Sequence, residues 1–199
     1  MHKGNLETNF PHVGILIVEH GVSLSAFTQA ITGLTAGTTY YVKAFATNSA
    51  GTGYGGQESF TTLIPYYMAK SDGNWSSTSI WFTNTTGGTN AATYATSATE
   101  APTASNSDGI IINADVAVDA DVSIDQTTIN SGKTLTINSG KTITIADGTG
   151  TDLSSEGTLD INGTISIGTA TVDANGTCDA TGGSVTFTSA GNLKLSGTV

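Results

Sequence analysis

Apolar and polar residues alternate along the chain from Ile110 to Ile124. Even-numbered positions in this stretch carry Ile, Val or Ala, and odd-numbered positions carry mostly Asp, Asn and Ser, with Ile111 as the one large exception. A period of two residues is typical of β-strands with one buried face. Around residues 126–128 the phase shifts, and the large aliphatic positions become odd-numbered: Ile129, Leu135, Ile137, Ile143 and Ile145. We interpret the shift as a corner between strands.

Residues 130–137 and 138–145 are almost the same octapeptide, NSGKTLTI and NSGKTITI. A second spacing lies over it, because Ile129, Leu135, Ile137 and Ile143 are followed 24 positions later by Leu153, Leu159, Ile161 and Ile167. Three strands of about eight residues, each with its turn, would complete one coil of a solenoid. We therefore predict an all-β chain whose residues 110–199 form a parallel β-helix with about 24 residues per coil, an array that we expect to continue beyond Val199. An antiparallel sandwich is the competing interpretation, since alternation and Asn-Gly turns also suit hairpins.

The segment before this array carries a different motif. Residues 34–40 read LTAGTTY, and residues 40–47 then alternate in the manner of a strand. The motif resembles the tyrosine corner of fibronectin type III domains, with Ala36 at the place of the usual proline. In such a corner the tyrosine hydroxyl, here that of Tyr40, hydrogen-bonds to the chain a few residues upstream. The resemblance covers about residues 21–62, whereas a full sandwich of this kind needs about 100 residues. We therefore expect residues 1–62 to be a partial fibronectin type III-like module.

We interpret residues 63–109 as a linker and a cap for the first coil. A repeat array exposes an apolar face at its end unless something covers it, and Trp75 and Trp81 are the natural candidates. The segments GNWSSTSIW and SDGIIINADVAVDADVSI resemble the opening of β-solenoid domains in large, adhesin-like surface proteins that bacteria secrete. The alternative is a ligand-binding role, in which Trp75, Trp81, Tyr66 and Tyr67 form an aromatic platform for sugar rings.

Charge and composition narrow the possible partners. The 199 residues carry a formal net charge of −10 with only six Lys and Arg. Nucleic acid needs a basic stripe, and an anionic membrane surface would repel such a chain, so we expect neither partner. The longest apolar run, residues 13–18, is shorter than the roughly 20 residues of a membrane-spanning helix, so we expect no insertion. Cys178 is the only cysteine, which rules out an internal disulfide.

Two sets of outward residues are candidates for binding. Asp115, Asp119, Asp121 and Asp125 share one polar face, and carboxylates at this density could hold Ca²⁺ loosely; we expect no other cofactor. Threonines 134, 136, 142 and 144 also point outward, and flat threonine ladders on solenoids can bind ice. The spacing of 24 residues would place Thr158, Asp160, Ser166 and Gly168 beside them, however, which breaks the ladder at once.

No residue set in the sequence identifies a reaction, so we expect no catalytic residues and no enzyme. The interpretation that we favour is a non-catalytic extracellular or cell-surface adhesion module, in which a spacer is followed by a solenoid stalk. Its expected partners are extracellular glycans or proteins on a host or neighbouring cell. The alternative is an accessory fragment of a secreted carbohydrate-active enzyme, a polysaccharide lyase or glycoside hydrolase of the β-helix type, because such folds serve both purposes.

Overall fold

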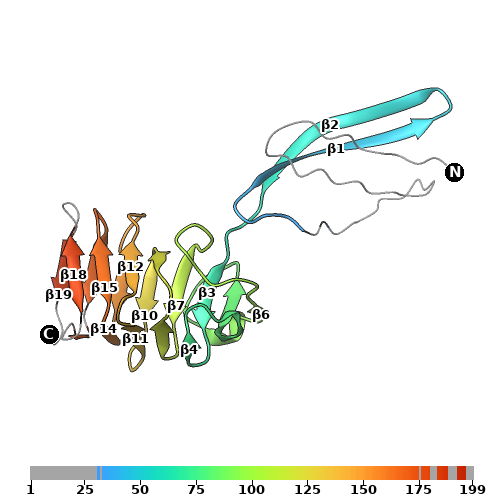
Figure 1. The fold of residues 1–199 in the computed structure, drawn as a ribbon. Helices are drawn as coiled ribbons and strands as arrows, with labels where there is room; N and C mark the ends of the chain where they lie inside the picture. Colours follow the sequence, from blue (N-terminus) through green and yellow to red (C-terminus); the bar gives the residue numbers. More distant parts are fainter. Residues whose placement is uncertain (1–30, 32, 175, 180–182, 188–191, 196–199) are drawn as a thin grey trace. The chain divides into compact units, whose positions relative to one another are not determined.

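The chain forms two compact units with their boundary between Leu63 and Ile64. The computed structural model (Figure 1) describes residues 31, 33–174, 176–179, 183–187 and 192–195. These residues form β-strands and two single-turn 3-10 helices, without any α-helix, so the all-β prediction is confirmed. None of the described helices is long and apolar enough to span a membrane.

Unit 1 contains an antiparallel hairpin of β1 (Thr39–Asn48) and β2 (Gly51–Thr61). Tyr40 is buried and stacks on Phe60 with 5.9 Å between ring centroids. Its hydroxyl oxygen accepts a hydrogen bond of 2.8 Å from the backbone N–H of Thr35. This is the local contact that we predicted for a tyrosine corner, although the fibronectin type III identification itself stays a prediction. The apolar run of residues 13–18, and residues 21–30 of the segment that carries the fibronectin type III resemblance, lie outside the described residues.

Unit 2 is built on three sheets of parallel strands. Sheet 1 contains β3 (Tyr66–Ala69), β7 (Gly109–Ile112), β10 (Thr127–Ile129), β13 (Leu153–Ser155), β16 (Thr171–Ala174) and β19 (Asn192–Leu195). Sheet 2 contains β4 (Gly73–Asn74), β8 (Val116–Val118), β11 (Thr134–Ile137), β14 (Thr158–Ile161) and β17 (Thr177–Asp179). Sheet 3 contains β9 (Val122–Ile124), β12 (Thr142–Ile145), β15 (Thr164–Ile167) and β18 (Ser184–Phe187). From β7 onward the chain visits sheets 1, 2 and 3 in turn and then returns to sheet 1, an arrangement that is compatible with the predicted solenoid (Figure 1).

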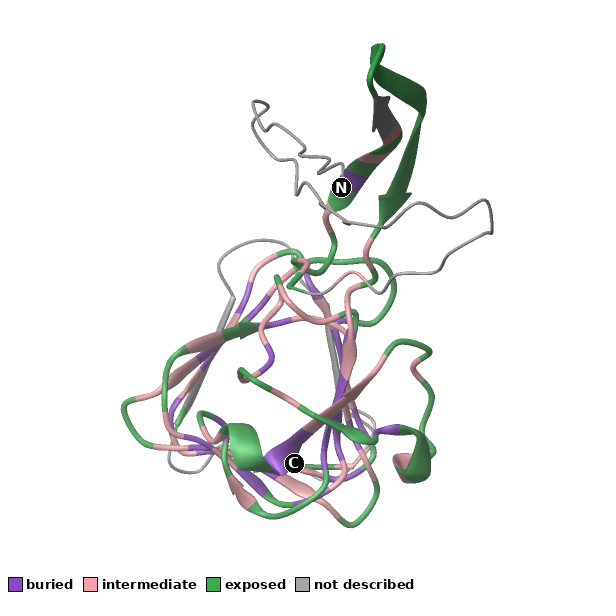
Figure 2. Cartoon of the chain, turned by 90° about the vertical axis from the view of Figure 1, so that its right-hand side faces the viewer, coloured by how far each residue is buried: buried purple, intermediate pink, exposed green. Residues whose placement is uncertain are grey.

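We call each passage of the chain through the three sheets a coil. Aliphatic side chains stack from one coil to the next inside this unit. In sheet 2, Leu135 of β11 pairs directly with Val116 of β8 and Leu159 of β14, and all three side chains are buried. Sheet 3 repeats the pattern, with Ile143 of β12 between Val122 and Ile165. Strand residues alternate between buried and more exposed positions, as the sequence pattern predicts (Figure 2). The antiparallel alternative therefore does not describe these sheets.

The coils differ in length, which corrects the predicted period of 24 residues. Leu135 and Leu159 are 24 positions apart as predicted. In sheet 1, however, Thr127 lies 17 positions after its partner Ile110, and Leu153 lies 26 after Thr127. In sheet 3 the partner of Ile143 is Ile165, 22 positions later, and not Ile167. The corners cause the variation, because their lengths range from two residues at 162–163 to seven at 146–152.

The alternating stretch from Ile110 to Ile124 is three strands and not one. β7, β8 and β9 follow each other on sheets 1, 2 and 3, and each corner between them has three residues. A corner with an odd number of residues leaves the inward positions of the next strand even-numbered. The sequence pattern therefore runs through both corners unchanged. The predicted phase shift coincides with the next corner, where Gln126 has a positive φ of 44°.

Residues 64–109 belong to unit 2 and supply its first strands as well as a cap. β3 pairs in parallel with β7, and β4 pairs in parallel with β8, so parallel pairing begins at Tyr66 and not at residue 110. On the other side of β3, the strands β5 (Trp81–Asn84) and β6 (Thr96–Ser97) continue sheet 1 in antiparallel order. The 3-10 helices η1 (Thr78–Ile80) and η2 (Ala91–Thr93) complete the segment.

A second small core explains why Ile111 breaks the alternation. Ile111 is only 9% exposed although its neighbours Ile110 and Ile112 occupy the main core. It packs instead in a separate cluster with Met68 and Tyr94, which lie on β3 and next to η2. The outer face of sheet 1 is therefore covered at its first strands, and an apolar residue is needed there.

Candidate functional site

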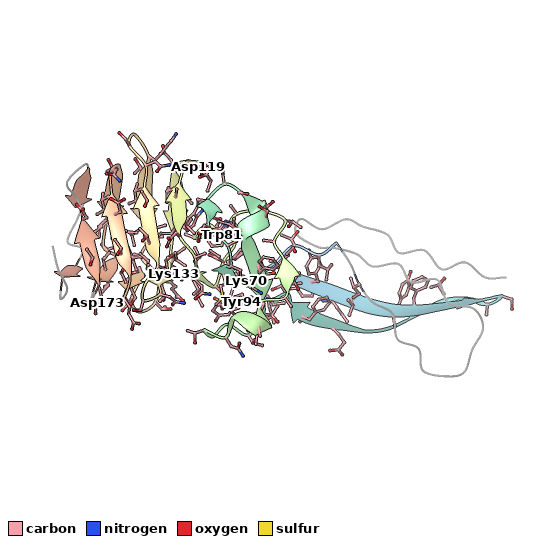
Figure 3. All side chains as sticks on the ribbon, turned by 90° about the horizontal axis from the view of Figure 1, so that it is seen from below. Lys70, Trp81, Tyr94, Asp119, Lys133 and Asp173 are labelled. Carbon is pink, nitrogen blue, oxygen red and sulfur yellow. The ribbon has the colours of Figure 1, made fainter. Side chains whose placement is uncertain are left out.

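The aromatic residues proposed as a sugar platform lie mostly inside the cap. Trp75 and Trp81 are 2% and 0% exposed, and their rings meet edge to face with 4.9 Å between centroids. The indole N–H of Trp81 donates to the carbonyl of Trp75, and that of Trp75 donates to the carbonyl of Pro102. Figure 3 shows Trp81 within this segment. Both indoles thus have the packing and the hydrogen bonds of core residues, and neither offers a ring face to a ligand.

The two tyrosines of the proposed platform differ from each other. Tyr67 is buried, and burial together with the charge of Glu100 raises the pKa of its phenol. Tyr66 is half-buried, and a hydrogen bond with Asp108, then burial and the charge of Asp108, raise the pKa of its phenol. Its ring lies so close to Gly109 that a Cβ there would overlap the ring. Tyr66 is thus the one partly accessible member, and a single partly covered ring is no platform.

The aspartates of the proposed calcium row bind backbone amides at separate corners. The Oδ1 atom of Asp115 accepts from Thr134 N–H at 2.9 Å, and that of Asp121 accepts from Thr142 N–H at 2.8 Å. Each bond links a corner to the first residue of the strand in the following coil. We call these contacts carboxylate staples.

Two aspartates outside the predicted row also bind backbone amides of the following coil. Asp72 accepts from the backbone N–H of Asp115, and buried Asp152 accepts from the N–H groups of Thr171 and Gly148. Among the described residues, no group of three or more His, Cys, Asp or Glu side chains could hold a metal ion. The carboxylates of the predicted calcium row therefore do not converge on one site. They are distributed over successive corners, and their oxygen atoms accept hydrogen bonds from backbone amides.

The other two aspartates of the row have different surroundings. Burial works against ionisation of Asp119, but hydrogen bonds from the side chain and the backbone of Ser76 outweigh it and lower the pKa of the carboxyl. Asp125 accepts from its neighbour Gln126 N–H at 2.8 Å. Burial, followed by contact with Asp152 and the charge of Asp147, raises the pKa of Asp125. Asp125 and Asp152 thus form a carboxyl pair at the long corner of residues 146–152.

Sheet 3 brings together hydroxyl residues that are far apart in the sequence. In one row, Thr142 pairs with Thr164, and Thr164 pairs with Ser184. In the other, Ser123, Thr144, Ser166 and Thr186 follow each other on β9, β12, β15 and β18. Ile143, Ile145, Ile165 and Ile167 lie between these residues and are all buried. We call these two rows the sheet 3 hydroxyl face; its described side chains are those of Ser123, Thr142, Thr144, Thr164 and Ser166.

One row in each of the other two sheets includes charged residues. In sheet 2, Thr136 pairs with Asp160, which pairs with Asp179. In sheet 1, Ser154 pairs with Asp173, which pairs with Lys194. Figure 3 shows Asp173 and Lys133 on one side of the unit and Asp119 at another edge. The row of Thr134, Thr158 and Thr177 in sheet 2 is uncharged as well, so sheet 3 differs from the others, among the described strands, in having no charged residue in either row.

Sequence reasoning missed these rows because it used one fixed spacing. At 24 residues, Thr142 and Thr144 meet Ser166 and Gly168, but their actual partners are Thr164 and Ser166. The available signal was the likeness of the strand segments TITI, TISI and SVTF, compared without regard to the corners between them. The staples of Asp72 and Asp152 were missed because neither residue belongs to the alternating stretch.

We compared the chain with protein-family models, with curated proteins and with solved structures, and none of them matches it.

Proposed function

We propose that the chain is a non-catalytic module of an extracellular or cell-surface protein. In this proposal, a fibronectin type III-like segment over residues 1–62 acts as a spacer, and unit 2 is a parallel β-helix that acts as a stalk. The observation that carries the proposal is that the carboxylates and the hydroxyl residues of unit 2 occupy different places and make different contacts. Its carboxylates hold neighbouring coils together, while its outward Thr and Ser rows lie on regular strands.

This arrangement favours the binding of a partner surface over catalysis. A catalytic carboxylate has to reach the substrate with at least one oxygen atom in productive geometry. Asp115 and Asp121 each bind the first amide of a strand, and Asp152 binds two amides while 1% exposed. Outward rows of hydroxyls, by contrast, can donate and accept hydrogen bonds along a large surface. The partners that we propose are extracellular glycans or proteins of a neighbouring cell surface.

Contact with glycans would rely on hydroxyl and amide groups and not on aromatic stacking. Trp75, Trp81 and Tyr67 are packed inside the cap, so the contribution of ring stacking to sugar binding is missing there. Individual contacts of this kind are weak. A stalk that presents repeated rows gains from several simultaneous contacts, which raise the overall affinity without a deep pocket.

The enzyme alternative depends on Asp125 and Asp152. A carboxyl whose pKa is raised by a second carboxyl is the pattern of an acid–base pair in glycoside hydrolysis. The pKa of Asp125 is raised first by burial and then by Asp152, and Asp152 is itself buried and accepts hydrogen bonds from the N–H groups of Gly148 and Thr171. A structural corner explains these contacts, so we favour the stalk.

The test uses the purified chain on an array of glycans and immobilised surface proteins, with Ca²⁺ and with a chelator. We expect saturable binding that the chelator leaves unchanged, and no release of reducing ends from soluble polysaccharides. Asp125→Asn serves as the control variant, because it removes the acid and keeps the shape of the side chain. Polysaccharide cleavage that disappears in this variant would overturn the proposal in favour of the enzyme.

A further inference from the structure

The register of sheet 3 is the starting point for an inference beyond adhesion. Each of the strands β12, β15 and β18 carries a hydroxyl residue, an aliphatic residue and a second hydroxyl residue: Thr142-Ile143-Thr144, Thr164-Ile165-Ser166 and Ser184-Val185-Thr186. The parallel pairing places the first hydroxyl residues in one row and the second in another. The result is a two-row array that is repeated once per coil.

The inward residues hold this array in place. Ile143, Ile145, Ile165 and Ile167 are 0–3% exposed. Slipping a strand by one residue would turn these side chains to solvent, so the register is strongly specified. The hydroxyl rows therefore keep a regular spacing from coil to coil, which is about 4.7–4.9 Å between neighbouring strands.

That spacing is close to one that occurs in ice. Hydrogen-bonded oxygens are about 2.75 Å apart, and a tetrahedral arrangement at that distance puts second-neighbour oxygens about 4.5 Å apart. The mismatch with the strand spacing is about 0.3 Å per coil, or about 0.6 Å from β12 to β18. Thr and Ser hydroxyls both donate and accept hydrogen bonds, so each can replace or hold one lattice oxygen.

The absence of charge in the rows of β12, β15 and β18 points in the same direction. Charged groups are strongly hydrated and orient water around themselves, which conflicts with a lattice. Asp121 precedes Thr142 at the rim of the first row, but its carboxylate accepts the Thr142 N–H. In sheet 2 the row of Thr134, Thr158 and Thr177 is uncharged, but Asp160 and Asp179 interrupt the row beside it, so only sheet 3 has two neighbouring uncharged rows among the described strands.

We infer that the sheet 3 hydroxyl face binds ice, with tetrahedrally hydrogen-bonded crystalline water as its ligand. The inference rests on the register of sheet 3 and does not depend on glycan binding. A crystalline polysaccharide is the other repeating lattice of hydroxyl groups. We favour ice because the aromatic rings that would stack on sugars are buried in the cap.

The two octapeptides provide a matched experiment. NSGKTLTI places Thr134 and Thr136 on sheet 2, and NSGKTITI places Thr142 and Thr144 on sheet 3. One variant of the full chain carries Thr142→Lys and Thr144→Lys, and the control carries Thr134→Lys and Thr136→Lys. Both changes add the same charge to outward positions of the same local sequence. Urea unfolding, followed by fluorescence of Trp75 and Trp81, establishes that both variants are folded.

The readouts are partition into slowly growing ice and inhibition of ice recrystallisation. We expect the unchanged chain and the sheet 2 variant to be enriched severalfold in ice over a non-binding reference protein, and the sheet 3 variant to fall to the reference level. No enrichment of the unchanged chain, or equal loss in both variants, would overturn the inference. Sedimentation with cellulose and chitin adds a second arm. Binding there that needs Thr142 and Thr144, without enrichment in ice, would overturn it as well and assign the face to a polysaccharide lattice.

Discussion

Replacing Leu135 by Ala tests whether stacked aliphatic residues stabilise unit 2. The Leu135 side chain is 0% exposed and lies between Val116 of the preceding coil and Leu159 of the following one. Removing three buried carbons costs about 2.4 kcal/mol at about 0.8 kcal/mol per methylene. The cavity adds to this value, and buried Leu→Ala changes cost about 2–5 kcal/mol in total. Because hydrogen-bonded strands on both sides resist collapse into the cavity, we expect about 4 kcal/mol.

Thr136→Ala is the matched control for this change. Thr136 is the next residue of β11 and faces outward, where its hydroxyl makes a 3.3 Å hydrogen bond with Asp160. Loss of a hydrogen bond of this kind costs about 1 kcal/mol, so we expect Thr136→Ala to cost much less than Leu135→Ala. The two variants remove side-chain atoms from adjacent positions of one strand, so the difference between them measures burial and not strand propensity.

Urea unfolding followed by tryptophan fluorescence is the appropriate assay. The chain has two tryptophans, Trp75 and Trp81, and both are buried in unit 2, so their emission reports on that unit. A double-mutant cycle of Leu135→Ala and Leu159→Ala should show a coupling energy of about 0.5–3 kcal/mol, as expected for residues in contact. A cost below about 1 kcal/mol for Leu135→Ala, or additive effects in the cycle, would refute the stacking argument.

Three further predictions concern the corners and unit 1. Burial and Asp152 raise the pKa of Asp125 in the folded chain. The protonated carboxyl therefore stabilises the fold fully at pH values below the usual aspartate pKa, and this stabilisation is lost as pH rises through the pKa of the folded chain. At pH 7, Asp125→Asn should therefore unfold at a higher urea concentration than the unchanged chain. Below about pH 4 the two should unfold at the same urea concentration. A difference that stays constant with pH would contradict the reasoning. Gly163→Ala should lower the free energy of unfolding by about 3 kcal/mol, because a Cβ there would overlap backbone carbonyls of the preceding coil. Gly140 has a φ of 74° and open space around it, so Gly140→Ala should cost about 1 kcal/mol. Equal costs in urea unfolding would contradict this distinction. Tyr40→Phe removes the acceptor of one backbone N–H, so that amide should exchange with solvent about fivefold faster in NMR, as expected for a loss of about 1 kcal/mol, and an unchanged rate would count against the corner.

The alternation of residue types predicted the interior of unit 2 well. Ile110, Ile112, Val116, Val118 and Ile124 are buried as the pattern requires. Period-two alternation reports which face a residue occupies, but it does not report which sheet the residue belongs to. Corners of three residues preserve parity, so three strands on three sheets looked like one stretch. The direction of pairing came instead from the repeated aliphatic spacing of Leu135 and Leu159.

The candidate sites were harder to predict than the core. Carboxylate density suggested a metal, yet the structure uses Asp115 and Asp121 as staples for backbone amides. A carboxylate that caps an amide of the next coil and one that binds a cation have the same residue type and the same outward position. They differ only in whether the oxygens of several residues converge, and convergence depends on the three-dimensional path of the corners. The aromatic residues were ambiguous for the same reason, because burial of Trp75 and Trp81 depends on how residues 70–107 fold back.

Coil length and strand register are independent in this unit, and this independence decides which face could carry a function. Register is held by inward aliphatic residues, which pair correctly whether the preceding corner has two residues, as at 162–163, or four, as at 138–141. Corners can therefore gain or lose residues without disturbing the outward rows. The rows of sheet 3 persist through spacings of 22 and then 20 residues, which no single period can reveal. Selection for a surface array would act on the strand tetrapeptides alone, so a comparison of strands, with the corners left out, is the way to find such a face in a sequence.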